Sequence, residues 1–330
     1  MSSVTSGAGT GLAVSVVVPT FGRLDLLDCS LDALTRQDLP AGTYEIIIVD
    51  GRPERNTLQL VAGWRARTLD RGPRLVYLAN DGAEGAAAAR NRGWRSATGA
   101  IIAFTDDDTV PATDWLRHGL AGFADDTDVL YGSVDTPHRV GATDDAGEAE
   151  ETAFEAANCF FRRDVLNALG GFDERFGGGW REASDLHFRL LEMHAAIVRA
   201  PQALVVHPQR PVWGASLRGM RKVSLDALLY KKHPALYRQK IRRLPCWEDY
   251  AVVAALLAAV AGLAGGYEIL AVTGCGAWLV LTAMSCIRRL HGRAQGAAHV
   301  ADVLITSALM PPVAVFWRMV GAIKYRVRFG

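Results

Sequence analysis

The sequence predicts an α/β fold with a mostly parallel sheet over residues 12–207, followed by an α-helical membrane region. The first observation behind this prediction is the alternation of short apolar runs with segments of helical periodicity. The second is a pair of stretches, residues 251–266 and 269–287, that contain no charged side chain. Hydrophobic residues make up 50% of the 330 residues and the net charge is +1, which excludes a disordered chain.

Each element of the α/β part follows from its local pattern. Strands are expected where Val, Ile and Leu cluster, at residues 14–18, 44–49, 74–78 and 101–104. Helices are expected between them, at residues 24–37, 57–67 and 85–97. Near-continuous apolar strands that alternate with helices are typical of a parallel sheet covered on both faces. Ligands of such sheets bind beyond the carboxyl ends of the strands, so we expect the chemistry there.

Three adjacent carboxylates, Asp106, Asp107 and Asp108, follow the strand expected at residues 101–104. Carboxylates at this spacing repel one another unless a cation is present, and hard oxygen ligands favour Mg²⁺ or Mn²⁺ shared with substrate phosphates. The alternative is a solvated acidic turn, or a helix N-cap through Asp108 and Thr109. The buried strand before the triplet favours the metal site.

Two further polar residues lie where a nucleotide could bind. Asp50 ends the strand expected at residues 44–49, where a carboxylate can accept from a ribose hydroxyl or a base N–H. A turn-forming Asp-Gly pair is the alternative. Arg90 lies in the Ala-rich helix expected at residues 85–97, where its guanidinium could pair with a diphosphate or be surface charge.

Seven motifs, taken in order and spacing, resemble the family-2 glycosyltransferases with the GT-A nucleotide-sugar fold. The matching residues are 16–21, 45–50, 89–93, 99–108, 158–163, 170–176 and 182–190. The resemblance implies a Rossmann-like GT-A domain at residues 12–215, preceded by a flexible segment at residues 1–11. It also implies a nucleotide-diphosphate sugar as the donor.

The resemblance assigns roles to residues of the nucleoside pocket. Pro19, Thr20 and Asp50 would line that pocket, and Arg90 would approach the base or the diphosphate. Many members have two Asp before the glycine where this chain has only Asp50, so the identity of the nucleoside stays open.

The D-x-D motif of the family falls on Asp106 and Asp108. Asp108 would be the main metal ligand, and Asp106 a second ligand or, like Asp107, a neighbour of the ribose. His207 matches a position where some relatives place a metal-ligating histidine, although a surface histidine is the alternative. The implied cofactor is Mg²⁺ or Mn²⁺, which would neutralise charge developing on the leaving nucleotide.

The expected catalytic base departs from the family pattern. Members of this type usually invert the anomeric centre in one displacement, which requires a carboxylate to take the acceptor's proton. Ala183 occupies the usual position of that base. Glu182 and Asp185 remain as candidates on roughly one helix face, and we favour Asp185. Alternatively, Glu182 is a carboxylate at a helix start and Asp185 a structural partner of Arg189.

Trp180 follows three glycines at residues 177–179. A mobile loop there could offer the indole ring as a platform for the acceptor. A core tryptophan after a turn is the alternative.

The C-terminal part has the pattern of a membrane region. Residues 216–248 mix basic and apolar side chains, which predicts amphipathic juxtamembrane helices on an anionic surface. Spans are expected at about residues 251–267 and 269–287, each close to the length that crosses a bilayer. Residues 300–318 contain two adjacent prolines and are expected to form a re-entrant or interfacial helix-Pro-helix, or a third span.

The charges that flank these spans predict their orientation. Basic residues lie at the same side of the first two spans, which the positive-inside rule makes cytoplasmic. We therefore expect a multi-pass protein of the cytoplasmic membrane whose catalytic domain faces the cytoplasm. Two or three spans form no obvious polysaccharide channel, so a homo-oligomer stays open.

Together these features predict a membrane-attached, metal-dependent, inverting glycosyltransferase that acts on a lipid-linked or cell-surface glycan acceptor. A polyprenyl-phosphate acceptor is an alternative, because a phosphate needs no base and Ala183 would then be unremarkable. A non-catalytic nucleotide-sugar-binding scaffold subunit of an envelope glycan assembly complex is the other alternative. Membrane lipids are expected partners, whereas nucleic acid is not, because apolar spans adjoin the basic segment and the net charge is near zero.

Overall fold

The computed structural model describes residues 12–82, 85–136, 154, 156–177, 179–208, 219–290 and 297–328. Residues 1–11, which the sequence predicts to be flexible, lie outside this part of the chain. The chain divides into two compact units: residues 1–137 with 153–209, and residues 138–152 with 210–330. The first unit is α/β and the second is helical in the residues described.

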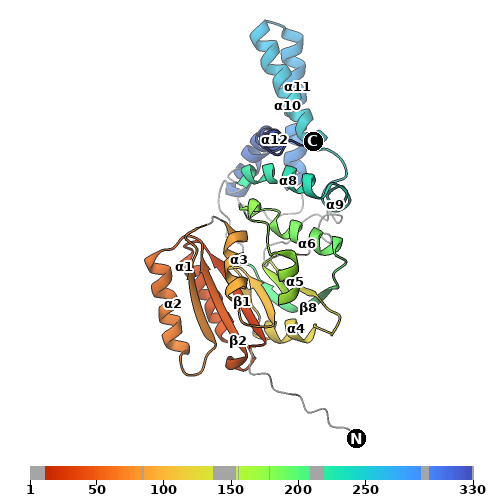
Figure 1. The fold of residues 1–330 in the computed structure, drawn as a ribbon. Coiled ribbons are helices and arrows are strands. Elements are labelled where there is room, and N and C mark those ends of the chain that lie inside the picture. The colour runs from red at the N-terminus through yellow and green to blue at the C-terminus, as the bar shows by residue number, and fades with distance from the viewer. Residues whose placement is uncertain are drawn as a thin grey trace. The chain divides into compact units, whose positions relative to one another are not determined.

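The described part of the first unit is built on one eight-stranded sheet (Figure 1). Its strands are β1 (Val14–Thr20), β2 (Tyr44–Asp50), β3 (Arg74–Ala79), β4 (Ile101–Thr105), β5 (Val110–Pro111), β6 (Val129–Asp135), β7 (Asn158–Arg162) and β8 (Ile197–Val206). Their order is β3-β2-β1-β4-β7-β6-β8-β5, in which β7 and β5 run against the others. The predicted mostly parallel, Rossmann-like sheet is confirmed, and the strand order reverses direction between β1 and β4.

Helices cover both faces of the sheet, as the sequence predicts. One face carries α1 (Leu24–Thr35), α2 (Arg55–Thr68) and α4 (Trp115–Ala121), and the other carries α3 (Ala86–Ser96), α5 (Arg163–Leu169) and α6 (Glu182–Glu192). Consecutive residues of β1 serve opposite faces, because Val16 and Val18 pack in the core with Leu31, whereas Val17 packs with Trp94. Two buried faces explain why the strands are mostly apolar.

The parallel register brings several strand ends to one edge of the sheet. Thr20 at the end of β1 lies opposite Asp50 of β2, and Asp50 lies opposite Ala79 of β3. Asp106 follows the end of β4 directly. Thr20, Asp50 and Asp106, which are predicted to bind the donor, therefore lie at the same edge of the sheet.

The first strand continues further than the sequence predicts. The apolar run predicts an end at residue 18, but β1 continues through Pro19 to Thr20. A proline lacks the N–H that a ladder needs. Pro19 is tolerated because β4 pairs with β1 only as far as Val17, so its position has a strand neighbour on one side.

The second unit consists of helices in the residues described. They are the 3-10 helix η3 (Met220–Val223) and the α-helices α8 (Ser224–Lys232), α9 (Pro234–Lys240), α10 (Trp247–Gly265), α11 (Glu268–Leu290) and α12 (Ala297–Tyr325). Three helical stretches, Trp247–Gly265, Glu268–Leu290 and Val300–Tyr325, are long and apolar enough to cross a membrane. The last differs from the expected helix-Pro-helix, because α12 continues through Pro311 and Pro312 as one helix.

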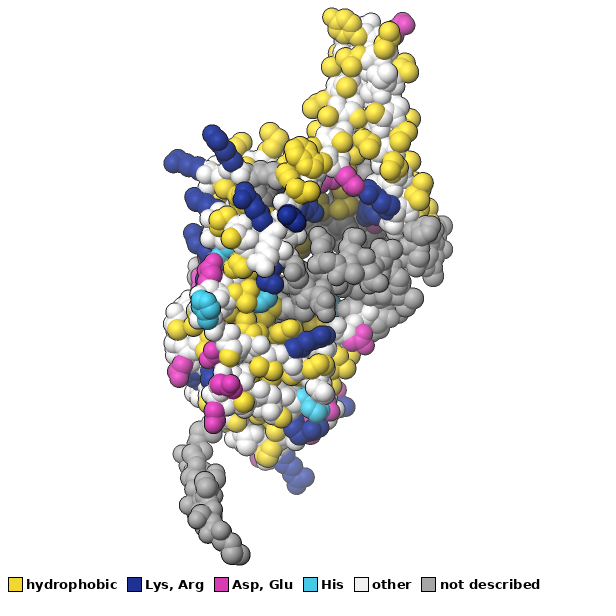
Figure 2. Space-filling model, turned by 90° about the vertical axis from the view of Figure 1, so that its right-hand side faces the viewer, with side chains coloured by type: hydrophobic (Ala, Val, Ile, Leu, Met, Phe, Trp, Pro, Cys, Tyr) yellow, Lys and Arg dark blue, Asp and Glu magenta, His cyan; other side chains and the backbone are white. Residues whose placement is uncertain are grey.

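Helices α10 and α11 form a hairpin that packs through small residues (Figure 1). A Cβ atom on Gly262 would lie 2.4 Å from the backbone nitrogen of Ala271. One on Gly274 would lie 2.5 Å from the backbone nitrogen of Ala259. Glycines let the two backbones approach closely, as in helix pairs within lipid. The outer surface of the hairpin is mostly apolar (Figure 2).

Helix α12 crosses the open end of this hairpin. That end is marked by Glu248 near the start of α10, which accepts two hydrogen bonds of 2.8 and 2.7 Å from Arg288 of α11. At the same level, Thr306 of α12 accepts from Arg289 at 2.9 Å and Arg318 of α12 donates to Asp249 at 2.6 Å. Residues 306 and 318 are about 18 Å apart along a helix. If α12 ran parallel to the hairpin, Thr306 and Arg318 could not both contact residues at its open end. Helix α12 therefore lies across that end.

Candidate active site

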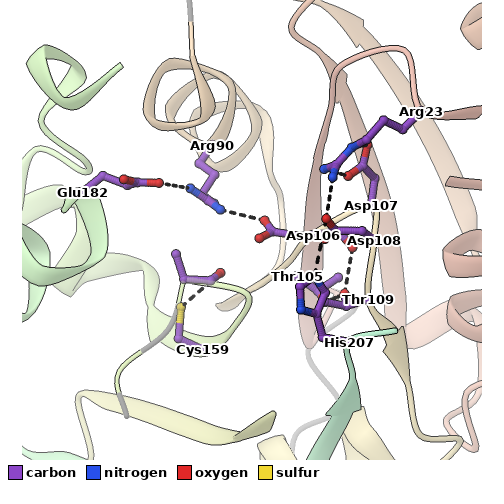
Figure 3. Close-up of polar contacts among 11 residues, drawn as sticks. Arg23, Arg90, Thr105, Asp106, Asp107, Asp108, Thr109, Cys159, Glu182 and His207 are labelled. Carbon is purple, nitrogen blue, oxygen red and sulfur yellow. Dashed lines mark hydrogen bonds and ion pairs between the residues drawn. The ribbon is translucent and has the colours of Figure 1, made fainter. Parts of the chain in front are cut away.

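The acidic triplet lies at the carboxyl edge of the sheet, and each of its carboxylates has a basic partner (Figure 3). The Asp107 side chain is fully buried and accepts a hydrogen bond of 2.7 Å from the Thr20 hydroxyl. Arg23, which follows the end of β1, forms ion pairs with both Asp107 and Asp108. Residues at the end of β1 thus hold the triplet that follows β4.

Burial and pairing act on Asp107 in opposite directions. Burial raises the pKa of Asp107 to about 6, although Arg23 and the Thr20 hydroxyl lower it. Burial lowers the pKa of Arg23, but Asp107 and Asp108 outweigh it and hold that pKa above its ordinary value. The desolvation penalty of the Asp107 carboxylate therefore exceeds what its partners offset, whereas the Arg23 guanidinium stays charged.

Arg90 of α3 bridges two carboxylates from different elements (Figure 3). Its guanidinium donates to Asp106 at 2.6 Å and to Glu182, the first residue of α6, at 3.3 Å. The Arg90 side chain is 4% exposed and its guanidinium carbon lies 5.5 Å from the centre of the Phe172 ring. Burial lowers the pKa of Arg90, but the two carboxylates outweigh it and raise that pKa above its ordinary value. Arg90 therefore links the triplet to the start of α6 as a permanent charge.

Asp108 and His207 form the pair best placed to hold a metal ion. His207 follows β8, and its Nε2 atom lies 3.5 Å from Oδ2 of Asp108. A carboxylate oxygen and an imidazole nitrogen at this separation fit a divalent cation whose other positions are filled by phosphate oxygens and water. Among the described residues, no group of three His, Cys, Asp or Glu side chains is placed to hold a metal ion. A metal at this pair would thus depend on the substrate to complete its ligands.

Asp50 is fully buried at the end of β2 and shapes the loop that follows. Its Oδ1 atom accepts from the backbone N–H of Arg52 at 3.1 Å, and its Oδ2 atom from that of Glu54 at 3.2 Å. The Tyr77 hydroxyl of β3 also donates to Oδ2, at 3.0 Å. Burial, together with this hydrogen bond, raises the pKa of Tyr77 to about 12. A carboxylate offers about four lone-pair positions, and these three hydrogen bonds occupy three of them.

Asn91 explains why two distant motifs occur together. Its amide donates to the Phe172 carbonyl at 2.8 Å and accepts from the Phe172 N–H at 2.8 Å. The turn before Phe172 contains Gly171 with φ +81°, and a Cβ atom there would lie 2.4 Å from Oδ1 of Asn91. The motifs at residues 89–93 and 170–176 therefore form one structural unit, which positions Arg90.

The two candidate bases have different surroundings. Asp185 is fully buried and accepts from Nε of Arg189 at 2.9 Å. Arg189 in turn donates to the carbonyls of Leu169 and Gly171 at 2.9 and 2.8 Å. Asp185 thus has the structural partner, and Glu182 the position at a helix start, that the sequence offered as an alternative, and Glu182 also joins the Arg90 cluster. This geometry favours Glu182 over Asp185 as a group that acts on substrate.

Trp180 lies in the loop before α6 with 38% of its surface exposed, so it is not the core residue that the alternative describes. The Arg181 guanidinium carbon lies 4.9 Å from the centre of its ring. Of the three glycines before it, Gly178 lies outside the described residues. An exposed ring is compatible with a platform for an acceptor.

Sequence analysis missed two residues of the site, Arg23 and Tyr77. Arg23 could have been found from its place just beyond a strand end, opposite three carboxylates without an assigned partner. Tyr77 could have been found because it lies in the strand next to the one that ends at Asp50. Both inferences require the order of the strands in the sheet, which the sequence pattern alone does not determine.

The family described as Glycosyl transferase family 2 matches residues 15–173. Glycosyltransferase AglE of Haloferax volcanii is 26% identical over 215 residues, which cover 60% of this chain and 67% of AglE. The pre-mycofactocin glycosyltransferase of Mycobacterium tuberculosis is 30% identical over 148 residues, or 38% of this chain and 31% of that relative. The chain thus spans about a third of the second relative.

A solved structure shares the fold. The mannosyltransferase PcManGT of Pyrobaculum calidifontis, in complex with GDP-Man and Mn²⁺, aligns with a TM-score of 0.59 at 20% identity. The alignment covers 95% of this chain and 86% of that one. This likeness supports the predicted GT-A fold, and the family match takes in β1, α3 and β4, which carry most of the site. Residues 15–173 therefore carry a glycosyl transferase family 2 domain.

Proposed function

We propose that the chain is a metal-dependent, inverting glycosyltransferase that takes its sugar from a nucleotide-diphosphate donor. The observation that carries this proposal is the charged cluster at the carboxyl edge of the sheet, formed by Arg23, Arg90, Asp106, Asp107, Asp108, Glu182 and His207. Such edges are where open α/β sheets bind ligands. The family 2 match of residues 15–173, and the GDP-Man bound to PcManGT, support the same class of donor.

The nucleoside and the diphosphate would meet different parts of this edge. Thr20 and Asp50, with Pro19 next to Thr20 in β1, would line the nucleoside side. Arg23 can turn towards a diphosphate, because its side chain is 44% exposed and already lies beside Asp108. Arg90 is too deeply buried to do so freely, and instead holds Asp106 and Glu182 in place.

Asp108 and His207 would hold Mg²⁺ or Mn²⁺, with Asp106 as a further ligand. When bound, the ion would offset negative charge on the leaving diphosphate. The chain's own contribution is geometry: Arg23 and Thr20 hold the neighbouring Asp107, which keeps the triplet in one arrangement. The Mn²⁺ in the PcManGT complex supports a divalent ion in this fold.

Glu182 is our candidate for the base that accepts the proton of an acceptor hydroxyl. It begins α6, and its Oε1 atom lies 3.3 Å from a nitrogen of Arg90, which fixes its position. Asp185 would act as a positioning residue through Arg189 and the turn at Gly171. Trp180, exposed in the preceding loop, would contact the acceptor.

A phosphate acceptor, such as a polyprenyl phosphate, is the second candidate. The observation that favours it is Ala183, which packs against the hydrophobic core where the family usually has its base. A phosphate oxygen is already a nucleophile at neutral pH, so transfer to it requires no general base. The two candidates predict different effects of a Glu182 substitution.

The apolar helices lead us to place the enzyme at a membrane, with an acceptor that a lipid carries. Helices α10 and α11 would span as a hairpin with Arg288 and Arg289 at the cytoplasmic side. Helix α12 would lie at the interface, because it crosses the open end of that hairpin. The catalytic unit would then face the cytoplasm, where nucleotide sugars are made.

Nucleotide release by the full chain in detergent tests this proposal. The assay would combine UDP-, GDP- and dTDP-sugars with Mn²⁺ or Mg²⁺ and a membrane lipid extract. We expect one donor to support release that requires metal and lipid, and that falls about 100-fold or more in Asp108→Asn. Asp38→Asn is the matched control, because it removes a surface carboxylate paired with Arg117 at 2.6 Å. Equal rates for Asp108→Asn and wild type would refute the assigned site.

A further inference from the structure

The helical unit contains a cavity that the proposed transfer reaction does not use. Its volume is about 960 Å³, within the size of known ligand sites, and its lining comes from residues between 226 and 246 together with Arg318 and Arg328. The cavity belongs entirely to α8, α9, the loop before α10, and the end of α12 with the residues that follow. It therefore lies where the juxtamembrane helices meet the first apolar helix.

The lining of this cavity is strongly basic. Six cationic side chains face it, against the single carboxylate of Asp226; they are Arg238, Lys240, Arg242, Arg243, Arg318 and Arg328. Lysine and arginine side chains also gather at the base of the apolar hairpin in the space-filling view (Figure 2). So many like charges around one space repel one another unless an anion is bound there.

The cations fall into two groups. Arg318 is held by Asp249 at 2.6 Å, and Arg238 is held by the hydroxyl and ring of Tyr230. In the part of the chain that the structure describes, the side chains of Lys240, Arg242, Arg243 and Arg328 form no ion pair or hydrogen bond. The first group is a fixed frame, and the second group has its donors available for a ligand.

The frame itself is well packed. The Tyr230 and Tyr237 rings meet edge to face at 5.6 Å, and Tyr237 is 4% exposed. Lys231 of α8 donates to the Tyr325 carbonyl at the end of α12, at 2.9 Å. A Cβ atom on Gly321 would lie 2.4 Å from the Ser224 carbonyl oxygen, so α8 and α12 approach backbone to backbone. These contacts fix Arg318 relative to the basic residues of α9.

We propose that this cavity binds the phosphate or pyrophosphate headgroup of a membrane lipid. Arginine is suited to phosphate because its planar guanidinium can donate two parallel hydrogen bonds. A lipid is favoured over a soluble phosphate because Leu244 and Trp247, beside the cavity, are 66% and 65% exposed. Exposed apolar and aromatic residues next to a long apolar helix are typical of the membrane interface. The inference goes beyond the proposed sugar transfer and does not depend on it.

Ligand binding to the full chain in detergent tests the proposal without any transfer reaction. The probes are dioctanoyl phosphatidic acid, dioctanoyl phosphatidylcholine and inorganic pyrophosphate, titrated by microscale thermophoresis. Phosphatidic acid should bind at least tenfold more tightly than the other two. The double variant Arg242→Gln/Arg243→Gln should lose at least tenfold in that affinity, and Arg242→Lys/Arg243→Lys should lose less.

The matched control is Lys222→Gln/Lys324→Gln, which removes the same charge from the same unit but outside the cavity lining. It should bind phosphatidic acid as wild type does. Equal losses in the two Gln double variants would overturn the proposal, because they would indicate attraction by general charge. Pyrophosphate affinity equal to that of phosphatidic acid would also overturn it, since the ligand would then be a soluble phosphate. Each variant would first be shown to keep the thermal stability of wild type, and a cavity variant that fails would be replaced by Lys240→Gln.

Discussion

Arg90 donates a hydrogen bond of 2.6 Å to Asp106 and thereby connects α3 to the acidic triplet after β4. The same guanidinium reaches Glu182 at the start of α6 at 3.3 Å. One buried side chain thus links two carboxylates of the candidate site. Breaking such a buried pair leaves uncompensated charge, which is far more costly than the loss of a surface pair.

Arg90→Met should therefore destabilise the protein by about 3 kcal/mol, because Asp106 and Glu182 would lose their shared cation. Arg92→Met is the control: Arg92 lies on the same helix but is exposed, so its loss should change the free energy of unfolding by less than about 0.5 kcal/mol. Urea denaturation followed by tryptophan fluorescence would measure both. Equal stability of the two variants would contradict a structural role for Arg90.

Glu182→Gln and Asp185→Asn should fail in different ways. If Glu182 is the base for a hydroxyl acceptor, its amide variant should lose about 10²- to 10⁴-fold in kcat and less stability than Asp185→Asn, because Arg90 keeps Asp106 as a partner. Asp185→Asn should lose about 1–3 kcal/mol of stability, because Arg189 loses its buried anionic partner. Turnover at saturating donor and thermal unfolding would be measured side by side. A stable but inactive Asp185→Asn would reverse the two roles, and an active Glu182→Gln would favour a phosphate acceptor.

Tyr77→Phe should weaken nucleotide binding about fivefold, because Asp50 would lose one of its donors at a cost of about 1 kcal/mol. The control is Tyr44→Phe, whose hydroxyl donates to the Leu34 carbonyl at 3.1 Å inside the core. It should leave nucleotide affinity unchanged. Isothermal titration calorimetry would compare the two, and equal losses would contradict a link between Asp50 and the nucleoside.

The stability of wild type should fall as the pH rises from about 10 to 12. Burial raises the pKa values of Tyr44 and Tyr77 to about 12, whereas an unfolded tyrosine titrates near 10. Between these values the unfolded chain releases protons that the folded chain keeps, so the free energy of unfolding decreases. Each Phe variant should flatten that slope in urea titrations. A slope unchanged in both variants would contradict the assignment.

The hairpin should be sensitive to side-chain size at one of two nearby glycines of α11. Gly274→Leu would place its Cβ atom 2.5 Å from the backbone nitrogen of Ala259, so α10 and α11 would have to separate. Gly276→Leu adds the same side chain where nothing lies within 4 Å. Thermal aggregation in detergent should begin at a lower temperature for Gly274→Leu alone. Equal behaviour of the two variants would contradict the close packing.

Much of the fold could be predicted from the sequence because its signals are local. Strands buried on both faces are mostly apolar, so β1, β2 and β4 can be recognised from Val and Ile runs. The extension of β1 through Pro19 could not be predicted, because it depends on where β4 stops pairing. The continuity of α12 through Pro311 and Pro312 is likewise decided by packing rather than by local propensity.

The site could be predicted in its residue types but less well in its contacts. Carboxylates after a strand identify an edge, so Asp50 and Asp108 follow from the pattern. Which cation reaches which carboxylate depends on tertiary distances, and Arg23 was missed for that reason. The choice between Glu182 and Asp185 also depends on tertiary structure. Helical spacing places both residues on one face, and both are buried, but Glu182 pairs with Arg90 and Asp185 with Arg189.

Calorimetric binding of UDP and GDP to the full chain, with and without Mn²⁺, tests most directly whether the sheet edge is a metal-assisted donor site. If Asp108 helps to hold a metal ion, Mn²⁺ should lower the Kd of one nucleotide at least tenfold in wild type and in Asp38→Asn. Asp108→Asn should abolish this effect and His207→Ala should reduce it. Nucleotide binding that is insensitive to Mn²⁺ in wild type, or equally enhanced by Mn²⁺ in Asp108→Asn, would contradict a metal-assisted donor site at this edge of the sheet.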